Sequence, residues 1–144
     1  MNFELSLMAR GSVEYARVDR CLCGGITGAK KVAAIAEAHQ VQIVPHNPLS
    51  PIGLAACLQL APSIPNFAIQ EYATGFEVGT FESRPEHLGS NIVDKVPLPE
   101  NGFVDIPNGH GLGMNLLPDA QKISPPLSKP IPMRPHFDGF IVDQ

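Results

Sequence analysis

The sequence predicts an α/β fold made of consecutive strand–helix units of a parallel sheet. Three short β-type runs occur, at residues 13–18, 41–45 and 66–70. Apolar helical patterns lie between them, and the spacing matches the roughly 25–30 residues that one strand–loop–helix–loop unit takes. One residue capable of acid–base chemistry follows each run: Asp19, His46 and Glu71. We therefore expect about three β/α units in the first half of the chain.

The first helix is predicted between Gly28 and His39. Ala29, Val32 and Ala33 fall on one face of this segment, which is the pattern of a helix packed against a sheet. Thr27 precedes it and is the expected N-cap.

The second helix is predicted to begin at Ser50-Pro51. Serine is a good N-cap, and proline suits the first helical position because its missing N–H needs no partner there. The residues up to Leu60 are almost all apolar. This helix should therefore be buried on most sides.

The character of the chain changes near residue 75. Ten of the 15 prolines lie beyond residue 84, and only short strands are plausible there, such as residues 102–106. We expect residues 1–75 to form the strand–helix units. Residues 76–144 are expected to form an extended tail that wraps back over another part of the protein.

Composition narrows the function classes. A length of 144 residues predicts one domain, and the net charge of −4 without a basic run argues against nucleic-acid binding. The sequence shows no secretory start and no apolar run that could span a membrane. Three cysteines cannot all pair, which favours a reduced, cytoplasmic protein. Neither a metal site nor a cofactor-binding loop is complete in the sequence.

The three strand-end residues form a candidate catalytic site, because chemistry collects at the carboxyl ends of parallel strands. His46 is the default proton carrier, and Asp19 could orient its ring. Glu71 could polarise a developing oxyanion if its pKa is raised. Two alternatives stay open: a His46 that only hydrogen-bonds its loop, and a Glu71 that is an exposed charge at a strand end.

Three segments carry a resemblance to a known family, at residues 23–31, 45–52 and 65–71. They resemble the enolase superfamily, in particular the mandelate racemase/muconate lactonizing branch and its galactonate dehydratase-like sugar-acid dehydratases. The turn at residues 109–114 and the ending at residues 134–139 are also similar to that branch. The resemblance runs from about residue 10 to the end of the chain.

The resemblance implies a TIM-like barrel covered by a capping domain. Residues 1–75 would be the last strands and helices of the barrel domain, and residues 76–144 a tail that wraps back toward the cap. It also implies removal of the proton next to a carboxylate, loss of water and formation of a 2-keto-3-deoxy acid, with Mg²⁺ as cofactor. His46 would be the base and Asp19 its orienting partner, and Glu71 would hydrogen-bond the substrate carboxylate. Members of the family are usually homo-oligomeric.

The family pattern also implies what this sequence lacks. The cap, the first five barrel strands, the metal carboxylates and the general acid would all lie upstream of residue 1. We therefore expect a C-terminal portion that is inactive alone and lacks metal ligands, with a missing N-terminal barrel polypeptide as a possible partner. The alternatives are a racemase or cycloisomerase of the same branch and a non-catalytic fragment.

Overall fold

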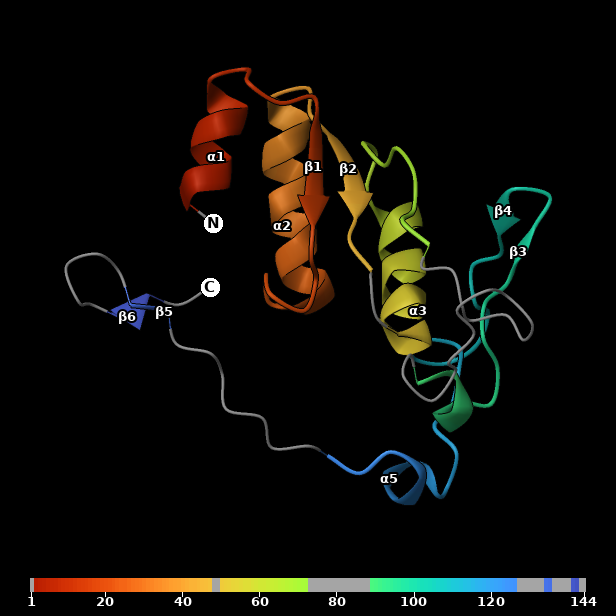
Figure 1. The fold of residues 1–144 in the computed structure, drawn as a ribbon. Coiled ribbons are helices and arrows are strands. Elements are labelled where there is room, and N and C mark those ends of the chain that lie inside the picture. The colour runs from red at the N-terminus through yellow and green to blue at the C-terminus, as the bar shows by residue number, and fades with distance from the viewer. Residues whose placement is uncertain (1, 48–49, 73–88, 127–133, 136–140, 143–144) are drawn as a thin grey trace.

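The structure is a computed structural model that describes residues 2–47, 50–72, 89–126, 134–135 and 141–142. The chain runs in order through α1 (Asn2–Ala9), β1 (Tyr15–Val18), α2 (Gly25–Ala38), β2 (Gln42–Pro45), α3 (Pro51–Leu60), β3 (Pro99–Glu100), β4 (Phe103–Val104), α5 (Ala120–Ile123), β5 (Arg134–Pro135) and β6 (Ile141–Val142). Short 3₁₀ turns lie at Ala61–Ser63 and Ser90–Ile92. Figure 1 colours these elements in chain order.

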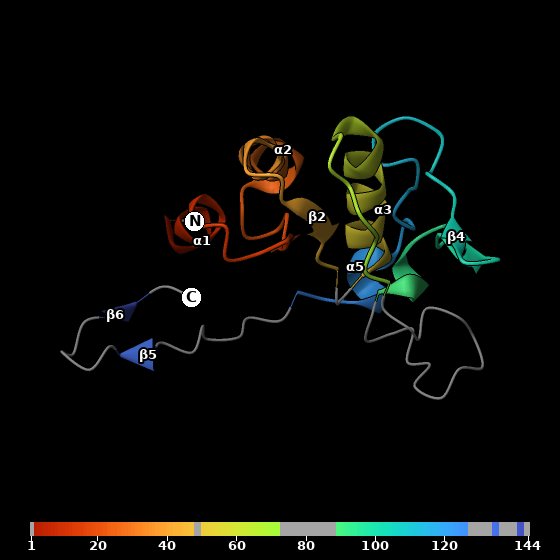
Figure 2. The ribbon, with the colours of Figure 1, turned by 90° about the horizontal axis from the view of Figure 1, so that it is seen from above.

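β1 and β2 form a parallel pair, with α2 as the connection between them. The register pairs Tyr15 with Gln42 at one end and Val18 with Pro45 at the other. Seen from above, α1, α2 and α3 lie in an arc along the two strands (Figure 2). The predicted α/β class and the first two strand positions are thus confirmed.

The third predicted strand, residues 66–70, does not form as a regular strand. Phe67 makes only an isolated parallel bridge with Ile43. Two backbone hydrogen bonds form the bridge, from the Ile43 N–H to the Asn66 oxygen and from the Ala68 N–H to the Ile43 oxygen. Side chains make the further bonds. The amide of Asn66 donates to the carbonyl oxygens of Ala33 and Val41, and that of Gln70 donates to Pro45. The segment therefore runs beside β2 and is held by one bridge and by side-chain bonds, without a regular ladder.

α2 begins earlier than the sequence predicts, and Thr27 is not its N-cap. The N-cap is Gly24, with φ of 94°, and Gly25 has φ of 73°. Only glycine adopts these left-handed values at little cost, so the pair forms the tight turn that starts the helix. The expected buried face is correct: Ala29, Val32 and Ala33 are buried.

α3 begins as predicted, because the Ser50 hydroxyl accepts a 3.0 Å hydrogen bond from the Gly53 N–H. Pro51 occupies the first helical turn. Leu54, Ala55 and Cys57 have no exposed surface. The helix is therefore a buried element whose first turn is fixed by its cap.

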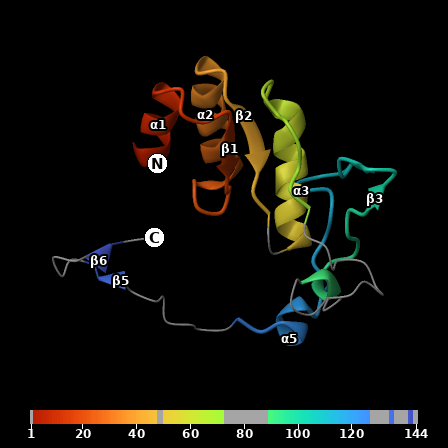
Figure 3. The same cartoon turned by 45° about the horizontal axis from the view of Figure 1, so that its top comes forward.

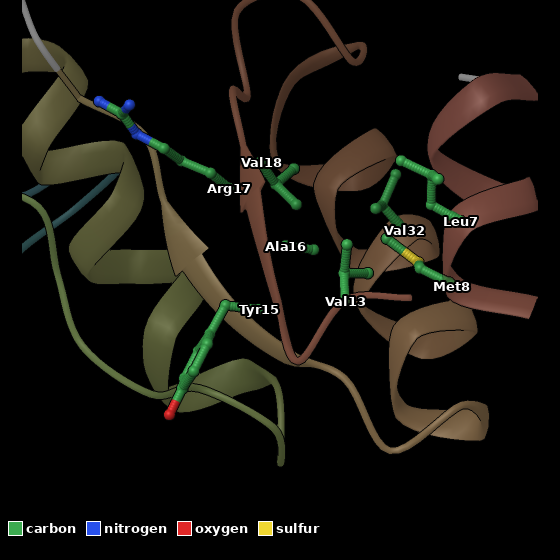
Figure 4. Close-up of a pocket in the computed structure, with 8 residues that line it drawn as sticks. All are labelled: Leu7, Met8, Val13, Tyr15, Ala16, Arg17, Val18 and Val32. Atoms are coloured by element: carbon green, nitrogen blue, oxygen red, sulfur yellow. The ribbon is translucent and has the colours of Figure 1, made fainter. Parts of the chain in front are cut away.

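The two faces of β1 differ in character. Ala16 and Val18 are buried, whereas Tyr15 and Arg17 are exposed. The buried side borders a cavity of about 200 Å³ lined by residues of α1, β1 and α2. Figure 4 shows Val18 directed toward these helices and Arg17 extending away from them. Arg17 is therefore free to take part in interactions on the opposite face of the sheet.

The described part beyond residue 88 contains short elements only. β3 and β4 pair antiparallel and lie beside α3, on the side away from β2 (Figure 3). The strand predicted over residues 102–106 is therefore shorter than expected. The boundary near residue 75 lies outside the described residues, as do residues 136–139 of the predicted C-terminal motif. The boundary and the wrapping tail stay predictions.

No helix within the described residues is long and apolar enough to cross a membrane.

We predict that Ser50→Ala lowers the free energy of unfolding by about 1 kcal/mol, because the substitution removes the N-cap acceptor of α3. Ser12→Ala is the matched control, since Ser12 is an exposed loop residue. Urea unfolding of both variants tests this. An equal effect of the two substitutions would show that the cap contributes nothing specific.

Candidate active site

The parallel register places Asp19 and His46 side by side, directly after β1 and β2. The His46 N–H donates to the Val18 carbonyl oxygen at 2.9 Å, which continues the ladder by one residue. His46 Nε2 lies 4.0 Å from Asp19 Oδ2. This is within ion-pair range but too long for a direct hydrogen bond. Asp19 Oδ1 instead accepts from the Cys21 N–H at 2.7 Å, so this carboxylate is tied to its own loop.

Glu71 is the hydrogen-bond partner of the His46 ring. Its Oε2 lies 2.6 Å from His46 Nδ1 and also accepts the Asn47 N–H at 3.0 Å. All three residues predicted from the sequence therefore meet at one site. The expected pairing differs, however, because the ring bonds to Glu71 and not to Asp19.

Arg17 completes the site, and the sequence reasoning missed it. Its guanidinium forms an ion pair with Glu71, and its Nε donates to Glu71 Oε2 at 3.3 Å. The side chain is 58% exposed, which weakens the pair through solvent screening. The signal was present in the sequence: Arg17 lies two residues before Asp19, so strand alternation puts both on one face.

The charge state of Glu71 follows from its neighbours. Partial desolvation acts to raise the pKa of Glu71, but hydrogen bonds from Arg17, the Asn47 N–H and His46 outweigh it. The pKa of Glu71 is therefore lower than its ordinary value. A raised pKa, which was the condition for Glu71 to polarise an oxyanion, is not what these surroundings produce. The residue is an ionised acceptor.

An ionised Glu71 determines where the proton of His46 lies. A carboxylate can only accept, so Nδ1 of the neutral ring must carry the hydrogen that fills the 2.6 Å contact. Nε2 then holds the free lone pair. The ring atom that can accept a proton in this arrangement is Nε2, which lies 4.0 Å from Asp19 Oδ2.

The site does not fit a magnesium ion. Magnesium needs near-octahedral oxygen ligands, and no group of three or more His, Cys, Asp or Glu that could hold a metal exists among the described residues. The oxygens of Glu71 are already engaged with Arg17, His46 and Asn47.

Comparison with known proteins identifies the family. Residues 5–120 match the model for the enolase C-terminal domain-like family. The chain is 34% identical over 115 residues to a D-galactonate dehydratase of Verminephrobacter eiseniae, which covers 76% of this chain and 28% of that protein. It is 31% identical over 115 residues to a D-xylonate dehydratase of Haloferax volcanii, which covers 80% of this chain and 26% of that protein.

A solved structure supports the same assignment. An enolase from Pantoea ananatis with bound D-gluconate and magnesium matches 83% of this chain and 27% of its own, at 30% identity and a TM-score of 0.66. This chain thus spans less than a third of the length of these three proteins.

The stability contribution of Glu71 should depend on pH. Because its pKa is lower in the folded than in the unfolded state, its contribution is fully present above the ordinary value of 4.5. That contribution is lost as the pH falls through the folded value. We predict that the difference in unfolding free energy between the wild type and Glu71→Gln is constant near neutrality and shrinks on acidification. Denaturant unfolding at a series of pH values measures it.

Glu37→Gln, on an exposed position of α2, is the control for this series. A difference at Glu71 that grows on acidification would mean that desolvation governs this carboxylate instead of its hydrogen bonds.

Proposed function

This chain belongs to the enolase C-terminal domain-like family, and we propose that it supplies the proton-abstracting side of a sugar-acid dehydratase site. One observation carries the proposal: Glu71 Oε2 lies 2.6 Å from His46 Nδ1. With Glu71 ionised, Nδ1 carries the ring hydrogen and Nε2 is left as the basic atom. The names of the two dehydratase relatives support a sugar acid of the galactonate or xylonate type as substrate.

In the proposed reaction, His46 Nε2 removes the proton on the carbon next to the substrate carboxylate. The resulting imidazolium carries its charge between two carboxylates, Glu71 at Nδ1 and Asp19 near Nε2. Both stabilise the charged ring, as a carboxylate does in a catalytic triad. The C–O bond to the hydroxyl group on the next carbon then breaks as a general acid protonates that hydroxyl, and water leaves. The enol that forms tautomerises to a 2-keto-3-deoxy acid.

The proposal gives Glu71 a role at the His46 ring instead of at the substrate, and the 2.6 Å contact between Glu71 Oε2 and His46 Nδ1 supports it. An ionised Glu71 would repel a substrate carboxylate, because like charges at short distance disfavour each other. The hydrogen bond from Arg17 lowers the pKa of Glu71 and so favours the ionised carboxylate that accepts Nδ1–H of the ring.

We predict that the chain alone has no dehydratase activity and acquires it with a polypeptide that supplies the remaining barrel strands. The reason is that the described residues provide a base but do not fit magnesium. A panel of sugar acids with magnesium, assayed with the chain alone and with the mixture, tests this. Turnover by the chain alone would contradict the proposal that this chain supplies only the proton-abstracting side of the site.

We further predict that His46→Asn, in the active mixture, lowers proton–deuterium exchange at the substrate α-carbon by at least about 100-fold, as expected on loss of a general base. NMR of the substrate in D₂O measures the exchange. His39→Asn, at the exposed end of α2, is the matched control and should exchange normally. Retained exchange in His46→Asn would identify another residue as the base.

A further inference from the structure

A buried arginine lies directly behind the catalytic loop. We propose that Arg20 is a positioning residue, whose guanidinium fixes the backbone at His46 and Asn47 so that both reach the same oxygen of Glu71. The inference rests on the proposed function only in taking His46 as the base.

The geometry of Arg20 joins two loops. Arg20 follows Asp19 in the loop after β1, and its side chain crosses to the loop after β2. Nη1 donates to the His46 carbonyl oxygen at 2.8 Å, and Nη2 donates to Asn47 Oδ1 at 3.2 Å. Two donors of one rigid, planar group therefore hold two consecutive residues, which a single flexible cation could not do.

Stability alone is a poor explanation for this arrangement. Arg20 is only 7% exposed, and the structure records no ion pair for it within the described residues. Burying a charge without a counter-ion costs free energy that neutral acceptors offset only in part. The nearby Cys57 thiol does not supply the counter-charge: burial raises its pKa, although Arg20 acts in the opposite direction.

α3 leaves space for the guanidinium at one position. A Cβ atom on Gly53 would lie 1.8 Å from Arg20 Nη2 and 2.5 Å from Asn47 Oδ1. Any larger residue at position 53 would therefore displace the arginine or the asparagine. The Ser50 cap fixes the Gly53 N–H, so the first turn of α3 is held where this close approach occurs.

Arg20 is linked to the His46 ring through Glu71 Oε2, because the Asn47 backbone and the ring both bond to this oxygen. Glu71 Oε2 accepts the Asn47 N–H at 3.0 Å and lies 2.6 Å from His46 Nδ1. Asn47 has no exposed surface, so its backbone cannot move without moving the packed side chain. A shift of this loop would therefore loosen the backbone bond and the ring bond together.

Hydrogen exchange of the Asn47 backbone amide tests the proposal, because this amide reports local opening of the loop. In Arg20→Met, we expect the Asn47 amide to exchange roughly tenfold faster or more, as loss of charge-assisted hydrogen bonds implies. The amides of Ile43 and Ala68, which bond to Asn66 and Ile43, report the core. A merely structural role would accelerate all three amides by the same factor.

Gly53→Ala provides an independent route to the same effect, because its Cβ would push on Arg20 without removing the charge. Arg10→Met is the matched control, since Arg10 is exposed at the end of α1. An unchanged ratio of Asn47 to core exchange in Arg20→Met would overturn the proposal. Should that variant not fold, the same ratio in Gly53→Ala decides. The measurement uses no substrate, so its failure is separate from a failure of the proposed reaction.

Discussion

The parallel pairing of β1 with β2 is the constraint on which the candidate site depends. Its register ends at Val18 and Pro45, so the next residues, Asp19 and His46, lie at the same edge. A slip of one residue would turn His46 to the other face of the strand. The burial of Ala16, Val18 and Ile43 fixes the register, because a slip would expose this apolar set.

In the candidate site at this edge, the carboxylate of Glu71 makes most of the contacts between the site residues. Glu71 receives hydrogen bonds from Arg17, His46 and the Asn47 backbone, and these outweigh its partial desolvation. The charge that results gives the imidazole one proton position and one free lone pair. Arg17 stabilises this charge from the solvent side, whereas the buried Arg20 acts on the loop backbone.

The convergence of Asp19, His46 and Glu71 could be predicted from spacing, because residues that follow parallel strands share one edge of the sheet. Which carboxylate bonds the ring could not be predicted. That depends on the Asp19 side chain, which turns back to the Cys21 N–H. The segment at residues 66–70 has the hydrophobicity pattern of a strand but makes only one bridge, to Ile43. Its Asn66 and Gln70 side chains bond the carbonyl oxygens of Val41 and Pro45, which a hydrophobicity pattern does not register. The need for glycine at position 53 could not be predicted either, because it arises only from the close approach of the Arg20 guanidinium to α3.

We infer that Glu71 holds Nδ1 of His46 protonated and leaves Nε2 as the basic atom. Nitrogen-15 NMR of the imidazole, at a pH where the ring is neutral, tests this claim most directly. We expect the spectrum to show a protonated Nδ1 and an unprotonated Nε2. A ring that carries its proton on Nε2 would contradict it.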